Sequence, residues 1–176
     1  LEKELNAIDE KVGDGDAGST FAAAGKKFKK ISSELPYASL HKLFTTIGRV
    51  LARETGGSSG VLLSMLFTKA GSSLEDDENI GKALSSGLEK MKSYGGAEQG
   101  DRTMIDAMQP AVEALSDGKS VKEAAEAARK GADETANITN TSAGRSSYLS
   151  ESSLEGIPDP GAEMVARVFE KLVDIV

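Results

Sequence analysis

The chain has 176 residues, of which 21 are basic, 28 are acidic and one is histidine, and it contains no cysteine. A chain of this length buries roughly 70% of its surface on folding and needs neither disulfides nor a structural metal, so we expect a single domain over residues 1–176. The missing cysteine excludes thiol catalysis and cysteine-based zinc sites, and the net charge of −7 argues against nucleic acid as a partner.

Membrane association and secretion are not expected either. The longest apolar run, VLLSMLF at residues 61–67, is far too short to span a bilayer. The first residues, LEKELNAIDEK, are charged and amphipathic rather than typical of a signal peptide. We therefore expect a cytoplasmic protein.

Helical periodicity dominates the chain from its beginning. Residues before Asp9 are expected to form part of a helix, and apolar spacing or helix propensity predicts seven further helices. Their approximate ranges are 18–33, 39–54, 59–71, 77–94, 104–115, 121–136 and 164–176. The only strand candidate, SSYLSESSL at 146–154, is better explained as a serine-rich loop. The sequence therefore predicts an all-α fold.

The connections between these helices are unusually rich in glycine beside serine, threonine, aspartate or arginine. Five of them share this composition: VGDGDAGS, TGGSSG, YGGAEQGDR, SAGRSSY and IPDPGAE. Such segments let backbone amides and hydroxyls approach a ligand closely. Their recurrence at several helix junctions predicts a binding site.

The segment VGDGDAGST at 12–20 fits none of three common phosphate or metal motifs. Its G-x-G-x-x-G match lacks the apolar strand that precedes a Rossmann turn, and the spacing of a P-loop is absent. An EF-hand loop that starts at Asp14 would place Gly18 and Gly25 where oxygen ligands belong.

A different cation site remains, made by Asp9, Asp14 and Asp16. Two aspartates two positions apart in a glycine-bracketed loop turn toward one point, and Asp9 can face it from the end of the preceding helix. Carboxylates are hard ligands that suit Mg²⁺, Mn²⁺ or Ca²⁺. The alternative is a solvated turn in which Asp16 caps the next helix.

A second motif, TGGSSGVLL, places Ser58 and Ser59 at a predicted helix start. Free amides and the helix dipole favour anions there, although ordinary N-capping by serine is an alternative. A cation loop together with an anion-binding helix start is what a magnesium–nucleotide complex requires.

Taken in order, VGDGDAGST, GGSSG, GDRTMIDAM, AGRSSY and PDPGA resemble the L-type, C-terminal nucleotide-binding domain of dihydroxyacetone kinases, and the resemblance covers essentially the whole chain. It implies an antiparallel barrel of eight helices with ATP or ADP and two Mg²⁺ at one end. Few residues precede Asp9, so the chain is either cut from a longer protein or has a truncated first helix.

The resemblance also implies roles for individual residues. The metals are assigned to Asp9, Asp14 and Asp16. The nucleotide is assigned to Ala17, Gly18, Ser19, Thr20, Ser58, Ser59, Gly95, Thr103, Met104, Arg145, Asp159, Pro160 and Gly161. Position 17 is often histidine in bacterial relatives, so Ala17 is given no side-chain role.

The implied activity is phosphoryl transfer from Mg–ATP to dihydroxyacetone held by a separate kinase domain or subunit. In that family a histidine of the other domain holds the substrate covalently. The single histidine here, His41, is interpreted as a surface or boundary residue, so no catalytic residue is assigned and the chain is expected to be half an enzyme. Two alternatives stay open: an ADP carrier that a phosphotransferase phosphocarrier protein rephosphorylates, and the nucleotide domain of a fatty acid kinase.

Overall fold

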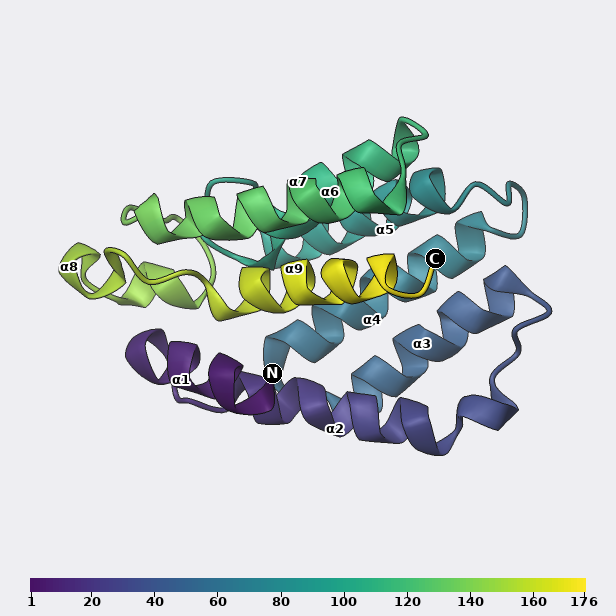
Figure 1. The fold of residues 1–176 in the computed structure, drawn as a ribbon, viewed down its shortest axis with the longest axis horizontal. Coiled ribbons are helices and arrows are strands. Elements are labelled where there is room, and N and C mark those ends of the chain that lie inside the picture. Colours follow the sequence, from purple (N-terminus) through teal and green to yellow (C-terminus); the bar gives the residue numbers. More distant parts are fainter. The chain divides into compact units, whose positions relative to one another are not determined.

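The computed structural model describes residues 1–176 and is entirely helical, without strands (Figure 1). Three short 3₁₀ helices, η1 to η3, accompany the α-helices. The elements are α1 (Glu2–Val12), α2 (Ala17–Lys30), η1 (Ser32–Glu34), α3 (Leu40–Glu54), α4 (Gly57–Ser73), α5 (Ile80–Gly95), α6 (Met104–Ser116), α7 (Val121–Glu134), η2 (Thr135–Asn137), η3 (Arg145–Tyr148), α8 (Glu151–Leu154) and α9 (Pro160–Val173). The predicted all-α class is confirmed. No helix has the length and apolar composition needed to cross a membrane.

The seven further helices predicted from the sequence correspond to α2–α7 and α9, and the start of the chain forms α1. The largest difference is at α9, which begins at Pro160 rather than near residue 164. The predicted loop at 146–154 contains most of η3 and the whole of α8. The serine-rich composition predicted a loop, whereas the segment contains two short helices.

Side-chain caps explain where several helices begin. Thr103 and Asp106 form a capping box at the start of α6, and Ser120 and Glu123 form another at the start of α7. These reciprocal bonds satisfy amides that the first helical turn leaves without partners. Asp159 caps α9 through the amide of Ala162, with a proline at the first helical position.

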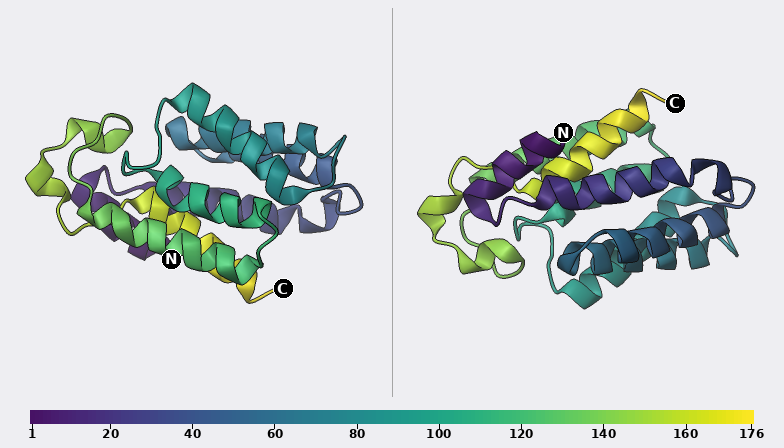
Figure 2. Two further views of the ribbon diagram at one scale, coloured as in Figure 1. Left: turned by 90° about the horizontal axis from the view of Figure 1, so that it is seen from above. Right: turned by 90° about the horizontal axis from the view of Figure 1, so that it is seen from below.

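Contacts divide the chain into two compact units, residues 1–18 with 96–176 and residues 19–95. In the first unit, α6, α7 and α9 pack against one another, and α1 packs against α8 and α9 (Figures 1 and 2). In the second unit, α4 packs against both α3 and α5.

Small residues allow the helices of the first unit to approach closely. The buried face of α7 consists of Ala124, Ala125, Ala128, Gly131 and Ala132. A side chain at Gly131 would collide with the carbonyl oxygen of Asp106 in α6. Proline at position 110 cannot donate to this carbonyl, which lies four residues before it. The backbone of α7 occupies the space beside that carbonyl.

Candidate metal and nucleotide site

The three predicted metal ligands lie close together where α1 leads into α2. Asp9 is in the last turn of α1, and Asp14 and Asp16 belong to the loop that follows. One oxygen from each carboxylate lies within 4.8 Å of the others. Asp9 is buried, with 4% of its surface exposed, whereas Asp14 and Asp16 are exposed. The cluster therefore consists of one buried carboxylate and two carboxylates that are exposed to solvent.

Asp9 is held in place by the backbone of the next helix. Its Oδ2 accepts hydrogen bonds from the amides of Asp16 (2.9 Å) and Ala17 (3.1 Å). Asp9 thus accepts hydrogen bonds from the backbone amides of residues 16 and 17, where α2 begins. This bonding fixes the orientation of the Asp9 carboxylate toward the loop.

Glycine is required at two positions of this loop. A side chain at Gly13 would collide with Oδ1 of Asp9 and would lie 3.0 Å from Nη1 of Arg145. Gly15 has φ of 77°, a left-handed conformation that other residues rarely adopt. The GDGD sequence therefore lets the chain pass directly over the carboxylate of Asp9.

Arg145 is the cation that faces this cluster. Its Nη1 lies 2.6 Å from Oδ1 of Asp14, and its Nη2 donates to Oδ2 at 2.9 Å. These hydrogen bonds hold the pKa of Asp14 at about 2. The negative charge of Asp14 raises the pKa of Asp16, with a smaller contribution from Asp9. One guanidinium opposes three carboxylates, so the cluster keeps an excess of negative charge.

The donors of this cluster fit the predicted metal. Three carboxylates supply hard oxygen ligands, which magnesium prefers over nitrogen or sulfur. Two of them are solvent-exposed and therefore accessible to a hydrated ion. Asp9, Asp14 and Asp16 would hold the metal in this arrangement.

Several residues of the first unit that the resemblance assigns to the nucleotide also come together. Thr103 caps α6, and Met104 is its first residue. A side chain at Gly161 would lie 3.3 Å from Cβ of Met104, and one at Gly144 would lie 2.8 Å from Cγ2 of Thr103. The first turn of α9 and the loop before Arg145 thus both pack against the start of α6.

The sequence did not predict that one further residue of this region is buried. Arg102, directly before Thr103, has only 1% of its surface exposed and bonds to Ser146 and to the backbone of Ile157. An arginine in a polar, glycine-containing loop ordinarily lies at the surface. No sequence pattern indicated its burial.

The remaining predicted residues belong to the second unit. Ser58 and Ser59 lie in the first turn of α4, as expected, but the N-cap is Gly56 and no side chain caps the helix. Ordinary N-capping by serine is therefore absent here. Gly95 ends α5, and a side chain there would lie 3.0 Å from Cδ2 of Leu62 in α4. Ser19 and Thr20 lie in the first turn of α2.

His41 has a backbone partner within the same unit. Its Nδ1 is 2.8 Å from the carbonyl oxygen of Gly71, and its Nε2 is 3.7 Å from Oε1 of Glu75. The side chain is 30% exposed. This environment is that of a boundary residue between α3 and α4, in agreement with the interpretation from the sequence.

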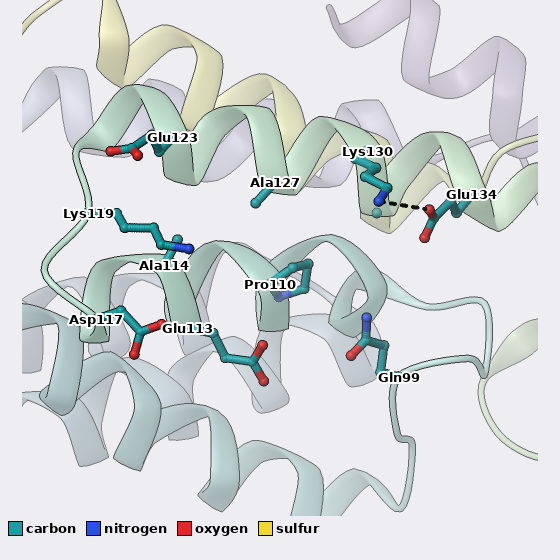
Figure 3. A pocket seen from close by; sticks show the side chains of 11 residues that line it. Gln99, Pro110, Glu113, Ala114, Asp117, Lys119, Glu123, Ala127, Lys130 and Glu134 are labelled. Carbon is teal, nitrogen blue, oxygen red and sulfur yellow. Dashed lines mark ion pairs between the residues drawn. The ribbon is translucent and has the colours of Figure 1, made fainter.

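A cavity of about 460 Å³ lies elsewhere in the first unit, between α6 and α7 (Figure 3). Figure 3 shows Ala127 pointing from α7 toward α6, where Pro110 lies, and the pair Lys130–Glu134 along α7. None of the predicted site residues lines this cavity. Its lining mixes acidic and basic side chains, among them Glu113 and Lys119.

Comparisons with known proteins connect this geometry to one family. The DAK2 domain model matches residues 11–174. The chain is 50% identical to a dihydroxyacetone kinase of Citrobacter freundii over 99% of its own length and 32% of that kinase. It is 33% identical to the ADP-binding subunit DhaL of a PEP-dependent dihydroxyacetone kinase of Listeria innocua, over 96% of this chain and 85% of that subunit.

A solved structure extends the likeness to three dimensions. The crystal structure of the Citrobacter freundii kinase in complex with AMP-PNP and Mg²⁺ matches with a TM-score of 0.87 and 45% identity, covering all of this chain and 31% of that one. The chain thus spans about a third of the length of that kinase. Because the DAK2 model matches nearly the whole sequence, the chain belongs to the DAK2 domain family.

Proposed function

We propose that this chain is the nucleotide-binding part of a dihydroxyacetone kinase and binds an adenine nucleotide together with Mg²⁺. The observation that carries the proposal is the convergence of Asp9, Asp14 and Asp16 within 4.8 Å, beside the start of α2. The similar Citrobacter freundii kinase was crystallised with AMP-PNP and Mg²⁺, and the Listeria innocua subunit is described as ADP-binding.

Several residues at the start of α2 and in the loop before it have roles in this proposal. The three aspartates hold the metal, and we assign them two Mg²⁺ by the family resemblance. Bound Mg²⁺ offsets the negative charge of the nucleotide phosphates. The start of α2 favours phosphate because the helix dipole is positive there, while the amide of Ala17 itself donates to Asp9.

Arg145 would supply a second source of positive charge. Its planar guanidinium already makes a two-pronged contact with Asp14. The same geometry suits a phosphate or the edge of a base. Thr103, Met104 and the turn from Asp159 to Gly161 are proposed to contact the adenosine.

The proposed reaction passes the γ-phosphoryl group of ATP to dihydroxyacetone on a separate kinase domain or subunit. This assignment is supported by the names of the relatives, which favour the dihydroxyacetone branch over a fatty acid kinase. Catalysis by this chain then consists of positioning the phosphates and offsetting their charge.

A second candidate function is an ADP carrier that is rephosphorylated in place by a phosphocarrier protein. The likeness to a subunit of a PEP-dependent kinase over 96% of this chain favours it. The dissociation rate of nucleotide separates the two modes. Retained ADP indicates the carrier, and rapid exchange indicates direct use of ATP.

The test of nucleotide binding is thermal unfolding with ADP, in the presence and absence of Mg²⁺. At a hundredfold excess over the dissociation constant, Mg–ADP should stabilise the fold by ~2.7 kcal/mol. For a chain of this size the melting temperature should rise by roughly 5 to 10 °C. ADP without Mg²⁺ should barely stabilise, because phosphates and carboxylates repel each other.

Asp14→Asn should abolish this Mg-dependent shift and leave the ligand-free melting temperature nearly unchanged, because the Asp14–Arg145 pair is more than half exposed. Asp76→Asn makes the same chemical change at an exposed position after α4 and should keep the full shift. An Asp14→Asn protein that retains the full shift would refute the metal site.

A further inference from the structure

Arg102 is the largest fully buried side chain of the protein, with 1% of its surface exposed. Its backbone has φ of 55°, the only positive φ at a residue other than glycine. Its Nε has no hydrogen-bond partner, and burial lowers the pKa of the guanidinium. A buried charge and a left-handed backbone are both costly, and such costs concentrate at functional positions.

The guanidinium of Arg102 joins three loops of the first unit. Nη1 donates to Oγ of Ser146 at 2.7 Å, and Nη2 donates to the carbonyl oxygen of Ile157 at 2.6 Å. The negative charge of Asp159 favours the charged form of Arg102. One side chain from the loop before α6 thus reaches both η3 and the loop before α9.

Asp101, the residue before Arg102, bonds to Ser142, four residues before Ser146. Oδ1 of Asp101 accepts hydrogen bonds from the backbone amide of Ser142 (3.1 Å) and from its hydroxyl (2.6 Å). Neighbouring residues 101 and 102 therefore anchor both ends of segment 142–146. Between these anchors, Gly144 with φ of 73° packs against Thr103.

Arg145 extends from this anchored segment toward the aspartate cluster. It is the residue directly before Ser146, and its guanidinium contacts both oxygens of Asp14. Its side chain is 57% exposed and has little packing of its own to fix it. The position of its backbone is therefore set by the segment that Asp101 and Arg102 hold.

We propose that Arg102 is a positioning residue for nucleotide binding: it holds segment 142–146 so that Arg145 faces the bound phosphates. This inference rests on the proposed function. Because Arg102 is buried, we assign it no contact with the nucleotide, and it acts through Arg145. A two-pronged contact needs its guanidinium in one orientation, so a small displacement of the segment weakens it.

A double-mutant cycle on the intact chain tests the proposal, with Mg–ADP affinity measured by calorimetry below the melting temperature of each variant. Arg102→Lys keeps the charge but cannot bridge two acceptors in a fixed plane. It should weaken Mg–ADP binding about tenfold, which is within the range for residues that act together. In an Arg145→Gln background the same change should have an effect of less than about twofold.

Ser146→Ala gives a milder second variant, which removes one acceptor and should weaken binding about threefold, again only when Arg145 is present. Arg129→Lys is the matched control, since Arg129 joins α7 to Glu163 and Glu170 of α9, outside the proposed site. It should lower the melting temperature and leave Mg–ADP affinity unchanged.

Failure of the proposed function and failure of this inference would look different. A wild-type chain that does not bind Mg–ADP would reject the proposed function and this inference with it. Wild-type binding with unchanged affinity in folded Arg102→Lys, or an equal loss with and without Arg145, would overturn the inference alone. If Arg102→Lys does not fold, the Ser146→Ala cycle decides by the same criteria.

Discussion

Asp14 and Asp159 belong to the same unit, yet their pKa values are displaced in opposite directions. Hydrogen bonds from Arg145 hold the pKa of Asp14 at about 2. Loss of solvent around Asp159 raises its pKa to about 6, although Ala162 and Arg102 favour the charged form. The first carboxylate is more than half exposed, so its ionisation stabilises the fold only slightly, and that small contribution is lost as pH falls from about 4 to 2. The second destabilises the fold when ionised.

Asp159→Asn should change the pH dependence of stability in a defined window. Between pH 3.8 and about 6 the folded chain binds more protons at Asp159 than the unfolded chain, so stability falls as pH rises through this range. Asparagine removes this titration and still caps α9 through Ala162. Between pH 4 and 7 the free energy of unfolding of the variant should rise relative to that of the wild type by at most about 3 kcal/mol. Urea unfolding at several pH values measures this difference. If the free energy of unfolding changed with pH in the same way for both proteins, the raised pKa of Asp159 would be contradicted.

Arg145→Lys tests whether the exposed cation of the cluster contacts nucleotide. Lysine keeps the charge but loses the planar pair of donors, so Mg–ADP affinity should fall about tenfold. Stability without ligand should change little, because the pair with Asp14 is more than half exposed. Calorimetric titration gives both affinities, with Arg167→Lys as a control on α9. Equal affinity in Arg145→Lys and wild type would remove Arg145 from the site.

At the scale of helices, the contact between α6 and α7 depends on Gly131. Gly131→Ala would drive a methyl group into the carbonyl of Asp106, and neither helix backbone can move without disturbing its packing. The free energy of unfolding should fall by about 2 kcal/mol or more. Gly25→Ala is the matched control, because a side chain at this position of α2 meets nothing within 4 Å. It should stabilise by about 0.5 to 1 kcal/mol through helix propensity. Similar changes in both variants, measured by urea unfolding, would contradict the close approach.

The helices also show what the sequence could predict. Apolar spacing located α3, α5, α6 and α9, and helix propensity located α7; both signals depend only on local sequence. The start of α9 was missed because Asp159 and Pro160 were interpreted as a loop, although aspartate and proline are typical of a helix start.

Site geometry was predictable only where it is local. The spacing of Asp14 and Asp16 indicated convergence, and the three carboxylates do lie together. The capping of α2 by Asp9 and the burial of Arg102 were not foreseen. Both depend on backbone partners that the fold brings close, such as the carbonyl of Ile157, 55 residues from Arg102.

At the scale of the whole molecule, the chain covers 32% of the Citrobacter freundii kinase and 85% of the Listeria innocua subunit. The same domain thus occurs within a long kinase and as a separate subunit. Asp14 and Arg145, on which the proposed function and the further inference rest, both belong to the first compact unit. Variants at these two positions therefore test the proposal within one unit.

The isolated chain should bind Mg–ADP without phosphorylating dihydroxyacetone. Its single histidine is bonded to the carbonyl of Gly71, and the proposal assigns no residue of this chain to hold the ketone. A coupled assay with ATP, Mg²⁺ and dihydroxyacetone should detect turnover only after a dihydroxyacetone-binding kinase subunit is added. His41→Asn should leave the turnover of that mixture unchanged. If the chain alone turned over dihydroxyacetone as fast as the mixture does, the substrate would have to bind within this chain, and the division of labour between two domains would be wrong.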